Sequence, residues 1–300
     1  MFTGPDLQCG ASPLRTNLSH AVLTDTLNTV RVQIRQTPIK KFLVAAGINS
    51  MGKRLYERII LSRQRHITTV LGHRLTFHVT SHEELFSIDD LHGEHEFMQR
   101  MLDASRPDDI WYDVGANIGM VSLLVADQQR GTRLKVYAFE PEPHNVEHLR
   151  TNAELNGLSA QIAVVPKGLG ARSQRVCLFV EGEVGTGQHT IVSETAHDRD
   201  AIEIELITGD DHASTTGDRP SVIKIDIEGA EMEALMGCEG LIREGAIREV
   251  FVEVHINRIF TPGFRTDADV RSWLESRGFA LAWSQQRRTE VLQHYRRLGR

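Results

Sequence analysis

The chain has 300 residues, 40% of them hydrophobic and 25% charged, so it can bury a full core and is not a disordered protein. Its formal net charge of -6 argues against a protein whose main task is to grip the phosphate backbone of a nucleic acid. Its three cysteines are far apart in the sequence, which suits a reducing compartment. We see neither a signal peptide nor an apolar run of the roughly 20 residues needed to span a membrane. We therefore expect a soluble cytoplasmic protein with no membrane partner.

The first ninety residues are predicted to form an extension, residues 1–90, ahead of a larger domain over residues 91–300. The extension begins without periodicity, and apolar residues then recur at helical spacing with Arg and Lys between them. We interpret those basic residues as the solvated faces of short helices, not as a surface for nucleic acid or membrane. The expected elements are a loose leader over residues 1–20, short helices within residues 23–61 and a β-hairpin formed by residues 67–71 and 75–80.

After a predicted helix over residues 93–104, strands alternate with helices, which indicates a parallel sheet covered on both faces. The expected strands are residues 110–114, 135–140, 162–166, 221–227 and 249–255, the helices are residues 119–129, 144–156, 230–237 and 268–277, and a final strand pair is residues 279–283 and 290–295. An insertion between the third and fourth strands is predicted to be a β-hairpin of residues 175–180 and 201–207 with a glycine-rich tip, long enough for an active-site lid.

The stretch Ile110–Gly119, IWYDVGANIG, predicts a strand, a tight turn and the start of a helix. Gly115 lets the backbone approach a ligand with no Cβ in the way, and Asn117 is a residue type that tolerates positive φ. The free N–H groups at the start of the helix then face the ligand. Two glycines four residues apart also occur in ordinary βα turns, so the surrounding residues decide the interpretation.

Glu140 follows the second strand, 21 residues after Gly119, at a position where an acid commonly accepts hydrogen bonds from ribose hydroxyls. The alternative is that Glu140 only caps the following helix. Asp113 at the end of the first strand would repel a dinucleotide pyrophosphate and suits a ligand with positive charge. S-Adenosylmethionine is such a ligand, since it carries an ammonium, a sulfonium and a ribose.

Four motifs occur in a fixed order: DVGANIG at Asp113–Gly119, FEPEPHNVEHLRTNAELNG at Phe139–Gly157, IKIDIEGAEMEALMG at Ile223–Gly237 and EVH at Glu253–His255. Together they resemble the FkbM family of S-adenosylmethionine-dependent methyltransferases over about residues 90–260. The resemblance implies an α/β class I methyltransferase fold, a Rossmann-like doubly wound sheet of seven strands, mostly parallel with an antiparallel last strand. It also implies O-methylation of a small-molecule hydroxyl, such as one on a sugar, glycoside or polyketide.

The same resemblance assigns roles to individual residues. It implies that Asn145 and Asn156 cap or buttress the helix after the second strand. The sequence departs from the family in the segment ITGDD before the fourth strand, where a Leu-Asp pair is usual, and at Cys238, where a small apolar residue is common. The expected cofactor residues are Asp113, Gly115, Asn117 and Gly119 for the methionine part, Glu140 for the ribose, and Lys167, Gly168 and Leu169 near the adenine.

Carboxylates cluster at the end of the fourth strand. Asp226 and Glu228 share one face of that strand and could hold a magnesium ion that positions an acceptor diol, because such ions prefer oxygen ligands. The alternative is helix capping, which we favour for Glu231 because acids in a first turn complement the helix dipole. Lys224 is expected to neutralise the cluster.

His255 is the predicted base, because its unperturbed pKa near 6.5 leaves it largely neutral at cytoplasmic pH. Glu253 shares its strand face and is expected to orient the ring. The alternative is a histidine hydrogen-bonded into the sheet edge, in which case Asp226 is the next candidate for the base. Two other functions stay open, a nicotinamide-dependent oxidoreductase and a non-catalytic cofactor-binding protein.

Overall fold

The computed structural model describes residues 57–180, 189–192, 201–256 and 261–299. The predicted leader, most of the predicted N-terminal helices and the glycine-rich tip of the insertion lie outside these residues. The chain divides into two compact units, Met1–Ser62 and Arg63–Arg300. Residues 57–63 are helical, and all elements below belong to the second unit.

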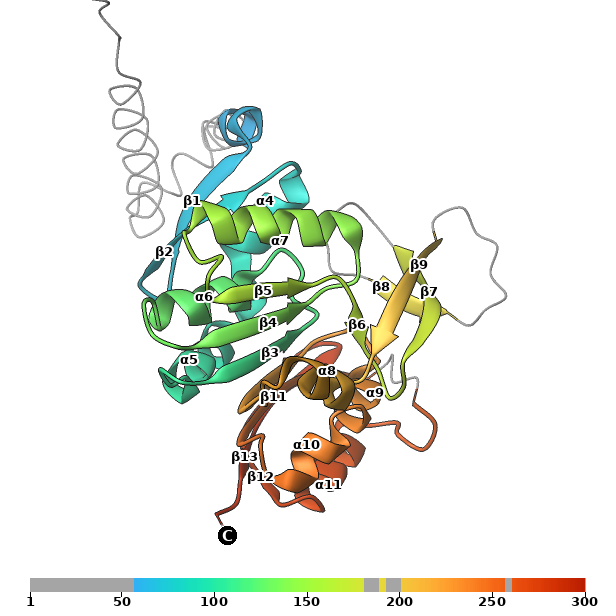
Figure 1. Ribbon diagram of the computed structural model, residues 1–300. Helices are drawn as coiled ribbons and strands as arrows, with labels where there is room; N and C mark the ends of the chain where they lie inside the picture. The colour runs from blue at the N-terminus through green and yellow to red at the C-terminus, as the bar shows by residue number, and fades with distance from the viewer. Residues whose placement is uncertain (1–56, 181–188, 193–200, 257–260, 300) are drawn as a thin grey trace, which may run out of the picture. The chain divides into compact units, whose positions relative to one another are not determined.

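A seven-stranded sheet forms the centre of this unit, in the order β5-β4-β3-β10-β11-β13-β12 (Figure 1). Strand β13 pairs antiparallel with β11 and with β12, and the other neighbouring pairs are parallel, which confirms the predicted fold class. The strands are β3 (Ile110–Val114), β4 (Lys135–Phe139), β5 (Ile162–Val165), β10 (Val222–Ile225), β11 (Glu249–His255), β12 (Phe279–Gln286) and β13 (Glu290–Arg297).

The apolar runs in the sequence explain why the central strands form. Every residue of β10 and β11 is buried, as expected for strands covered on both faces. Strand order reverses between β3 and β10, and the carboxyl ends of β3, β4, β10 and β11 lie at one edge of the sheet. This edge is where ligands bind in open α/β sheets.

Helices α5 (His95–Ala104), α6 (Met120–Gln128), α7 (Pro143–Leu155), α9 (Glu231–Met236) and α11 (Asp267–Glu275) lie close to their predicted ranges. Four helical elements are not predicted from the sequence: α4 (His82–Asp90), the short 3-10 helix η1 (Leu91–Gly93), α8 (Gly209–Thr216) and α10 (Glu239–Glu244). None of the helices among the described residues has the length and apolar character needed to cross a membrane.

The predicted N-terminal hairpin consists of β1 (Arg65–Val70) and β2 (His73–His78) and folds with the sheet, although the predicted domain began only at residue 91. Two asparagines of the α7 region explain this. The side-chain oxygen of Asn152 accepts a hydrogen bond from the backbone N–H of His78 at 2.6 Å, and that of Asn156 accepts one from Thr76 at 2.8 Å. Asn156 therefore ties β2 to the end of the helix.

The insertion before β10 is a second sheet in the order β6-β9-β7-β8, and not the simple hairpin predicted (Figure 1). Strands β7 (Gln174–Val180) and β9 (Ala201–Ile207) pair antiparallel as expected, but β8 (His189–Val192) also pairs with β7, and β6 (Gly168–Leu169) pairs with β9. Through β6 this sheet is continuous with the segment that follows β5.

Candidate functional site

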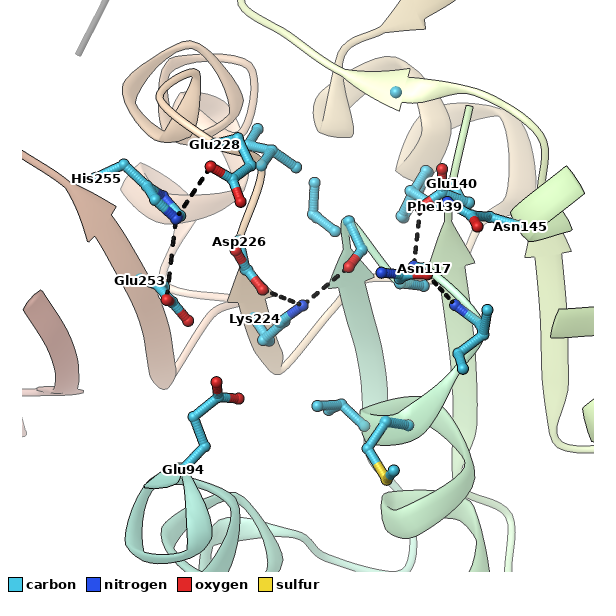
Figure 2. A pocket seen from close by; sticks show the side chains of 18 of the residues that line it. Glu94, Asn117, Phe139, Glu140, Asn145, Lys224, Asp226, Glu228, Glu253 and His255 are labelled. Atoms are coloured by element: carbon cyan, nitrogen blue, oxygen red, sulfur yellow. Dashed lines mark hydrogen bonds and ion pairs between the residues drawn. The ribbon is translucent and has the colours of Figure 1, made fainter. Parts of the chain in front are cut away.

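A cavity of about 560 Å³ opens at the carboxyl edge of the central sheet. Figure 2 shows two groups of polar side chains in it, with Lys224 between them. We call one the glycine end, which comprises the turn of residues 115–118, Glu140 and Asn145, and the other the acid end, which comprises Glu94, Asp226, Glu228, Glu253 and His255. Apolar residues of α4, α5 and the insertion sheet form much of the remaining wall.

The turn at the glycine end has the predicted backbone conformation, with φ values of 75° at Gly115, 51° at Asn117 and 97° at Gly119. A Cβ atom at Gly115 would lie 1.9 Å from the backbone oxygen of Asp226, so only glycine fits there. A Cβ atom at Gly119 would lie 2.2 Å from Cδ1 of Leu149, so this glycine serves the packing of α6 on α7. Asn117 lines the cavity, and its side-chain oxygen accepts the N–H of Ile118 at 2.8 Å.

Glu140 lies behind the turn and is only 4% exposed. Its two carboxylate oxygens accept hydrogen bonds from the backbone N–H groups of Asn117, at 2.8 Å, and Glu142, at 2.9 Å. Burial raises the pKa of Glu140 to about 7, although these two N–H groups act in the opposite direction. A carboxylate fixed in this way retains lone pairs that can accept ligand hydroxyls.

Asn145 lines the cavity beside Glu140, and the sequence analysis assigned it only a buttressing role. The side chain is buried and favours the charged form of Glu140, but neither its nitrogen nor its oxygen makes a hydrogen bond of regular geometry with the described residues. An unsatisfied amide facing a cavity is suited to a ligand with both donors and acceptors.

Asp113 is buried beneath the turn and does not line the cavity. Its Oδ2 atom accepts the hydroxyl of Ser122 at 2.6 Å, and its Oδ1 atom lies 3.3 Å from Nζ of Lys224. Nζ of Lys224 also donates to the backbone oxygen of Gly115 at 3.0 Å and lies 3.5 Å from the carboxylate of Asp226. Burial acts to lower the pKa of Lys224, but the two carboxylates outweigh it and raise the pKa.

The segment after β5 also differs from the prediction in one residue. Gly168 and Leu169 line the cavity as expected. Lys167 does not, because its side chain points to the insertion sheet and pairs with Glu205 at 2.7 Å.

At the acid end, Asp226 is the most accessible of the three predicted catalytic residues, with 34% of its side chain exposed. Glu228 adopts a left-handed conformation with φ 56°, which is strained for a residue with a side chain and is often found at functional sites. Its carboxylate lies 3.5 Å from Nε2 of His255. Figure 2 shows Glu94 facing this group from the opposite side of the cavity.

His255 is held by a residue that the sequence analysis assigned to helix capping. Its Nδ1 atom lies 2.8 Å from Oε1 of Glu231, which also accepts the backbone N–H of Gly229 at 2.8 Å. Burial lowers the pKa of His255, but the contact with Glu231 and the charges of nearby carboxylates outweigh it and raise the pKa to about 9. The expectation of a neutral imidazole at neutral pH is therefore wrong for the ligand-free chain.

Glu253 faces the cavity from β11 and is only 7% exposed. Burial raises its pKa to about 9, and the negative charges of Asp226 and Glu94 contribute to this rise. Arg287, between β12 and β13, lies 3.0 Å from Glu94 and 3.7 Å from Glu253. The sequence analysis missed both Glu94 and Arg287, which come from elements outside the recognised motifs.

Several known proteins similar to this chain are methyltransferases. A family described as "Methyltransferase FkbM domain" matches residues 113–281. The chain is 31% identical over 196 residues to hexuronic acid methyltransferase AglP of Haloferax volcanii, and the matched residues cover 64% of this chain and 75% of that protein. It is 26% identical over 204 residues to 31-O-demethyl-FK506 methyltransferase FkbM of Streptomyces tacrolimicus, which covers 59% of this chain and 77% of that protein.

A likeness is also found among solved structures. The crystal structure of methyltransferase FkbM from Methylobacillus flagellatus KT has a TM-score of 0.46 with 16% sequence identity, and the match covers 82% of this chain and 60% of that one.

Proposed function

The chain belongs to the FkbM family of methyltransferases, and from this premise we propose that it transfers the methyl group of S-adenosylmethionine to a hydroxyl oxygen of a small molecule such as a sugar, glycoside or polyketide. The observation that carries the proposal is one cavity with two chemically different ends. Lys224 connects them, because it contacts Asp226 at the acid end and the backbone oxygen of Gly115 at the glycine end. One end suits a nucleoside, and the other suits a molecule with hydroxyl groups.

The glycine end fits S-adenosylmethionine in three respects. Gly115 leaves its backbone open to close approach, Glu140 offers fixed acceptors to ribose hydroxyls, and Asn145 has an amide without a regular partner among the described residues. The cofactor supplies a methyl carbon made electrophilic by its sulfonium. The chain's part is to hold that carbon in line with the acceptor oxygen, and such alignment is worth effective molarities of about 10⁵–10⁸ M.

The acid end would bind the acceptor. We assign Asp226, Glu253 and His255 the task of orienting its hydroxyl, since all three line the cavity. Asp226 would receive the proton, because the raised pKa values of Glu253 and His255 leave those two groups protonated at neutral pH. Carboxylates and imidazole are common partners of hydroxyls, and a positioned proton acceptor adds roughly 10²–10⁴-fold to a rate. The names of the two curated relatives, which mention a hexuronic acid and an O-demethylated substrate, support an oxygen acceptor.

The test combines binding and turnover. We expect calorimetry to show S-adenosylmethionine binding by the wild type and roughly ten- to a hundredfold weaker binding by Glu140→Gln, because a charge-assisted hydrogen bond contributes about 1.5–3 kcal/mol. Glu147→Gln, which changes an exposed carboxylate on the helix that follows Glu140, is the matched control. Methyl-labelled cofactor with a panel of sugars, glycosides and polyketides then identifies the acceptor. Tight NAD binding without S-adenosylmethionine binding would contradict the proposal and favour the oxidoreductase.

A further inference from the structure

The acid end also has the composition and geometry of a metal site. We propose that Asp226, Glu253 and His255 bind a divalent transition-metal cation, with Mn²⁺ as the appropriate probe. One donor atom from each of these residues lies within 4.8 Å of the others. Ligand atoms bound to one cation at about 2.1 Å lie no more than about 4.2 Å apart, so a small side-chain adjustment closes the site.

The orientation of His255 is that of a metal-binding histidine. Its Nδ1 atom is engaged by the carboxylate of Glu231, at 2.8 Å, so Nε2 is the atom directed to the cavity. Nε2 lies 3.9 Å from Oε1 of Glu253. Metal-bound histidines almost always have their other ring nitrogen fixed in this way, by a carboxylate or a backbone oxygen. Glu231 is therefore a positioning residue and not a ligand.

The state of Glu253 is the second, independent observation. Its side chain is nine-tenths buried and faces the cavity, yet it accepts no hydrogen bond from the residues that the structure describes. The nearest cationic nitrogens, on Arg287 and His255, are 3.7 and 3.9 Å away. Lys224 is already shared between Asp113, Asp226 and the backbone oxygen of Gly115. Glu253 therefore has few contacts that would favour its charged form, and a bound cation would take the place of the proton that it otherwise holds.

The donor set selects the kind of cation. Imidazole together with carboxylates suits Mn²⁺ or Zn²⁺, whereas Mg²⁺ prefers oxygen ligands only. This set differs from the magnesium pair of Asp226 and Glu228 expected from the sequence, because Glu228 is not within the group of close donor atoms. Resting on the proposed function, the cation would bind the acceptor hydroxyl and lower its pKa, as bound metals do for water. The hydroxyl proton would pass to the oxygen of Asp226 that does not bind the cation.

Metal binding itself provides the test. After treatment with a chelator and removal of the chelator, the wild type should bind one Mn²⁺, measured by calorimetry and by the loss of the free Mn²⁺ signal in electron paramagnetic resonance. Glu253→Gln, His255→Gln and Asp226→Asn should each weaken binding at least tenfold, whereas Glu290→Gln, which changes another carboxylate of the cavity lining, should not. Circular dichroism identifies any variant that fails to fold, and Asp226→Asn, at the most accessible of the three positions, is the variant most expected to fold.

The outcomes separate this inference from the proposed function. Absence of Mn²⁺ binding by a wild type that still binds S-adenosylmethionine, or binding that none of the three variants weakens, overturns the metal site. Methyl transfer that persists undiminished in excess chelator also overturns it while leaving the proposed function standing. Mn²⁺ binding that depends on the three residues, without methyl transfer to any acceptor, supports the site and contradicts the function.

Discussion

Asn145 lies at the third position of α7, where its backbone N–H is capped by the carboxylate of Glu142 at 2.7 Å. Its side-chain amide, in contrast, is buried without a hydrogen bond of regular geometry. A buried polar group that lacks a partner costs roughly 1–3 kcal/mol. A residue that lowers the stability of the free protein in this way is explained most simply by a ligand that satisfies it.

This explanation predicts that Asn145→Leu, a substitution of similar volume, changes the stability of the protein and its affinity for S-adenosylmethionine in opposite directions. The free energy of unfolding of the ligand-free protein should stay the same or rise by about 1 kcal/mol, since an unsatisfied amide is replaced by an apolar group. The affinity for S-adenosylmethionine should fall at least about tenfold. Urea unfolding and calorimetry measure the two quantities. A variant that loses stability but keeps its affinity would show that Asn145 is a structural residue.

At this scale the sequence predicts residues whose partners are close along the chain. Gly115, Asn117 and Glu140 were expected because one strand–turn–helix pattern contains or precedes them. Glu94 and Arg287 could not be expected, because they reach the cavity from α5 and from the β12–β13 connection, 193 residues apart. The protonation of His255 was also beyond the sequence, since it depends on burial and on Glu231, which lies on another element.

Helix α8 and the start of α10 pack against each other, and their contact explains both departures from the family pattern. In the segment ITGDD, Gly209 lies against Cys238, since a Cβ atom at Gly209 would be 2.3 Å from the sulfur. Asp210 accepts the backbone N–H groups of Gly240 at 2.8 Å and Leu241 at 3.0 Å and so caps α10. Gly209 therefore leaves the space that the side chain of Cys238 fills.

We therefore predict coupled effects of substitutions at Gly209 and Cys238. Gly209→Ala should destabilise the protein by about 1–3 kcal/mol, because the added methyl group overpacks a buried contact. Cys238→Ala removes the sulfur atom that the added methyl group would meet. The loss in free energy of unfolding of the double variant should therefore be smaller than the sum of the losses of the two single variants, by at least about 0.5 kcal/mol. Denaturant unfolding of the four proteins gives this coupling energy. Strict additivity would mean that the two residues are not in contact.

How well the sequence predicts a helix or strand depends on how long and how regular the hydrophobic pattern of that segment is. The central strands were predicted because their apolar runs are continuous and bounded by turns, as in β10 and β11. Helices α9 and α10 both have only six residues, but α9 directly follows the fourth predicted strand, whereas α10 follows another short helix and has no such neighbouring signal. Strand β8 was missed because its place in the insertion depends on pairing with β7 and not on its own sequence.

The stability of the whole unit depends in part on a buried ion pair that joins α4 to α7. Nδ1 of His148 lies 2.7 Å from Oε1 of Glu84, and both side chains are buried. The contact with Glu84 raises the pKa of His148. Burial acts to raise the pKa of Glu84, but His148 and the backbone N–H groups of Thr80 and Ser81 outweigh it and lower the pKa.

The signs of these shifts define a pH window. The contribution of Glu84 is present above its ordinary pKa of 4.5 and is lost as the pH falls through its lowered value. The contribution of His148 is complete below its ordinary pKa of 6.5 and is lost as the pH rises through its raised value. The pair should therefore stabilise the protein most between those two ordinary values.

His148→Gln tests this window, because glutamine keeps a hydrogen-bond donor but not the charge. The free energy of unfolding should fall by roughly 1–3 kcal/mol near pH 5.5 relative to wild type, and by clearly less near pH 8.5. His144→Gln, which changes an exposed histidine of the same helix, should show no such dependence. An equal loss for His148→Gln at both pH values would mean that packing, and not charge, explains the effect.

The 1.9 Å that would separate a Cβ atom at Gly115 from the backbone of Asp226 has a consequence for redesign. Because this contact locks the ends of β3 and β10 together, a change there moves the methyl donor and the acceptor at the same time. Ile204 and Thr289 also line the cavity, but they belong to the insertion sheet and to the β12–β13 connection, so substitutions there do not touch that pair of strand ends. A directed-evolution library confined to these two elements would thus alter the choice of acceptor while inheriting an intact reaction centre.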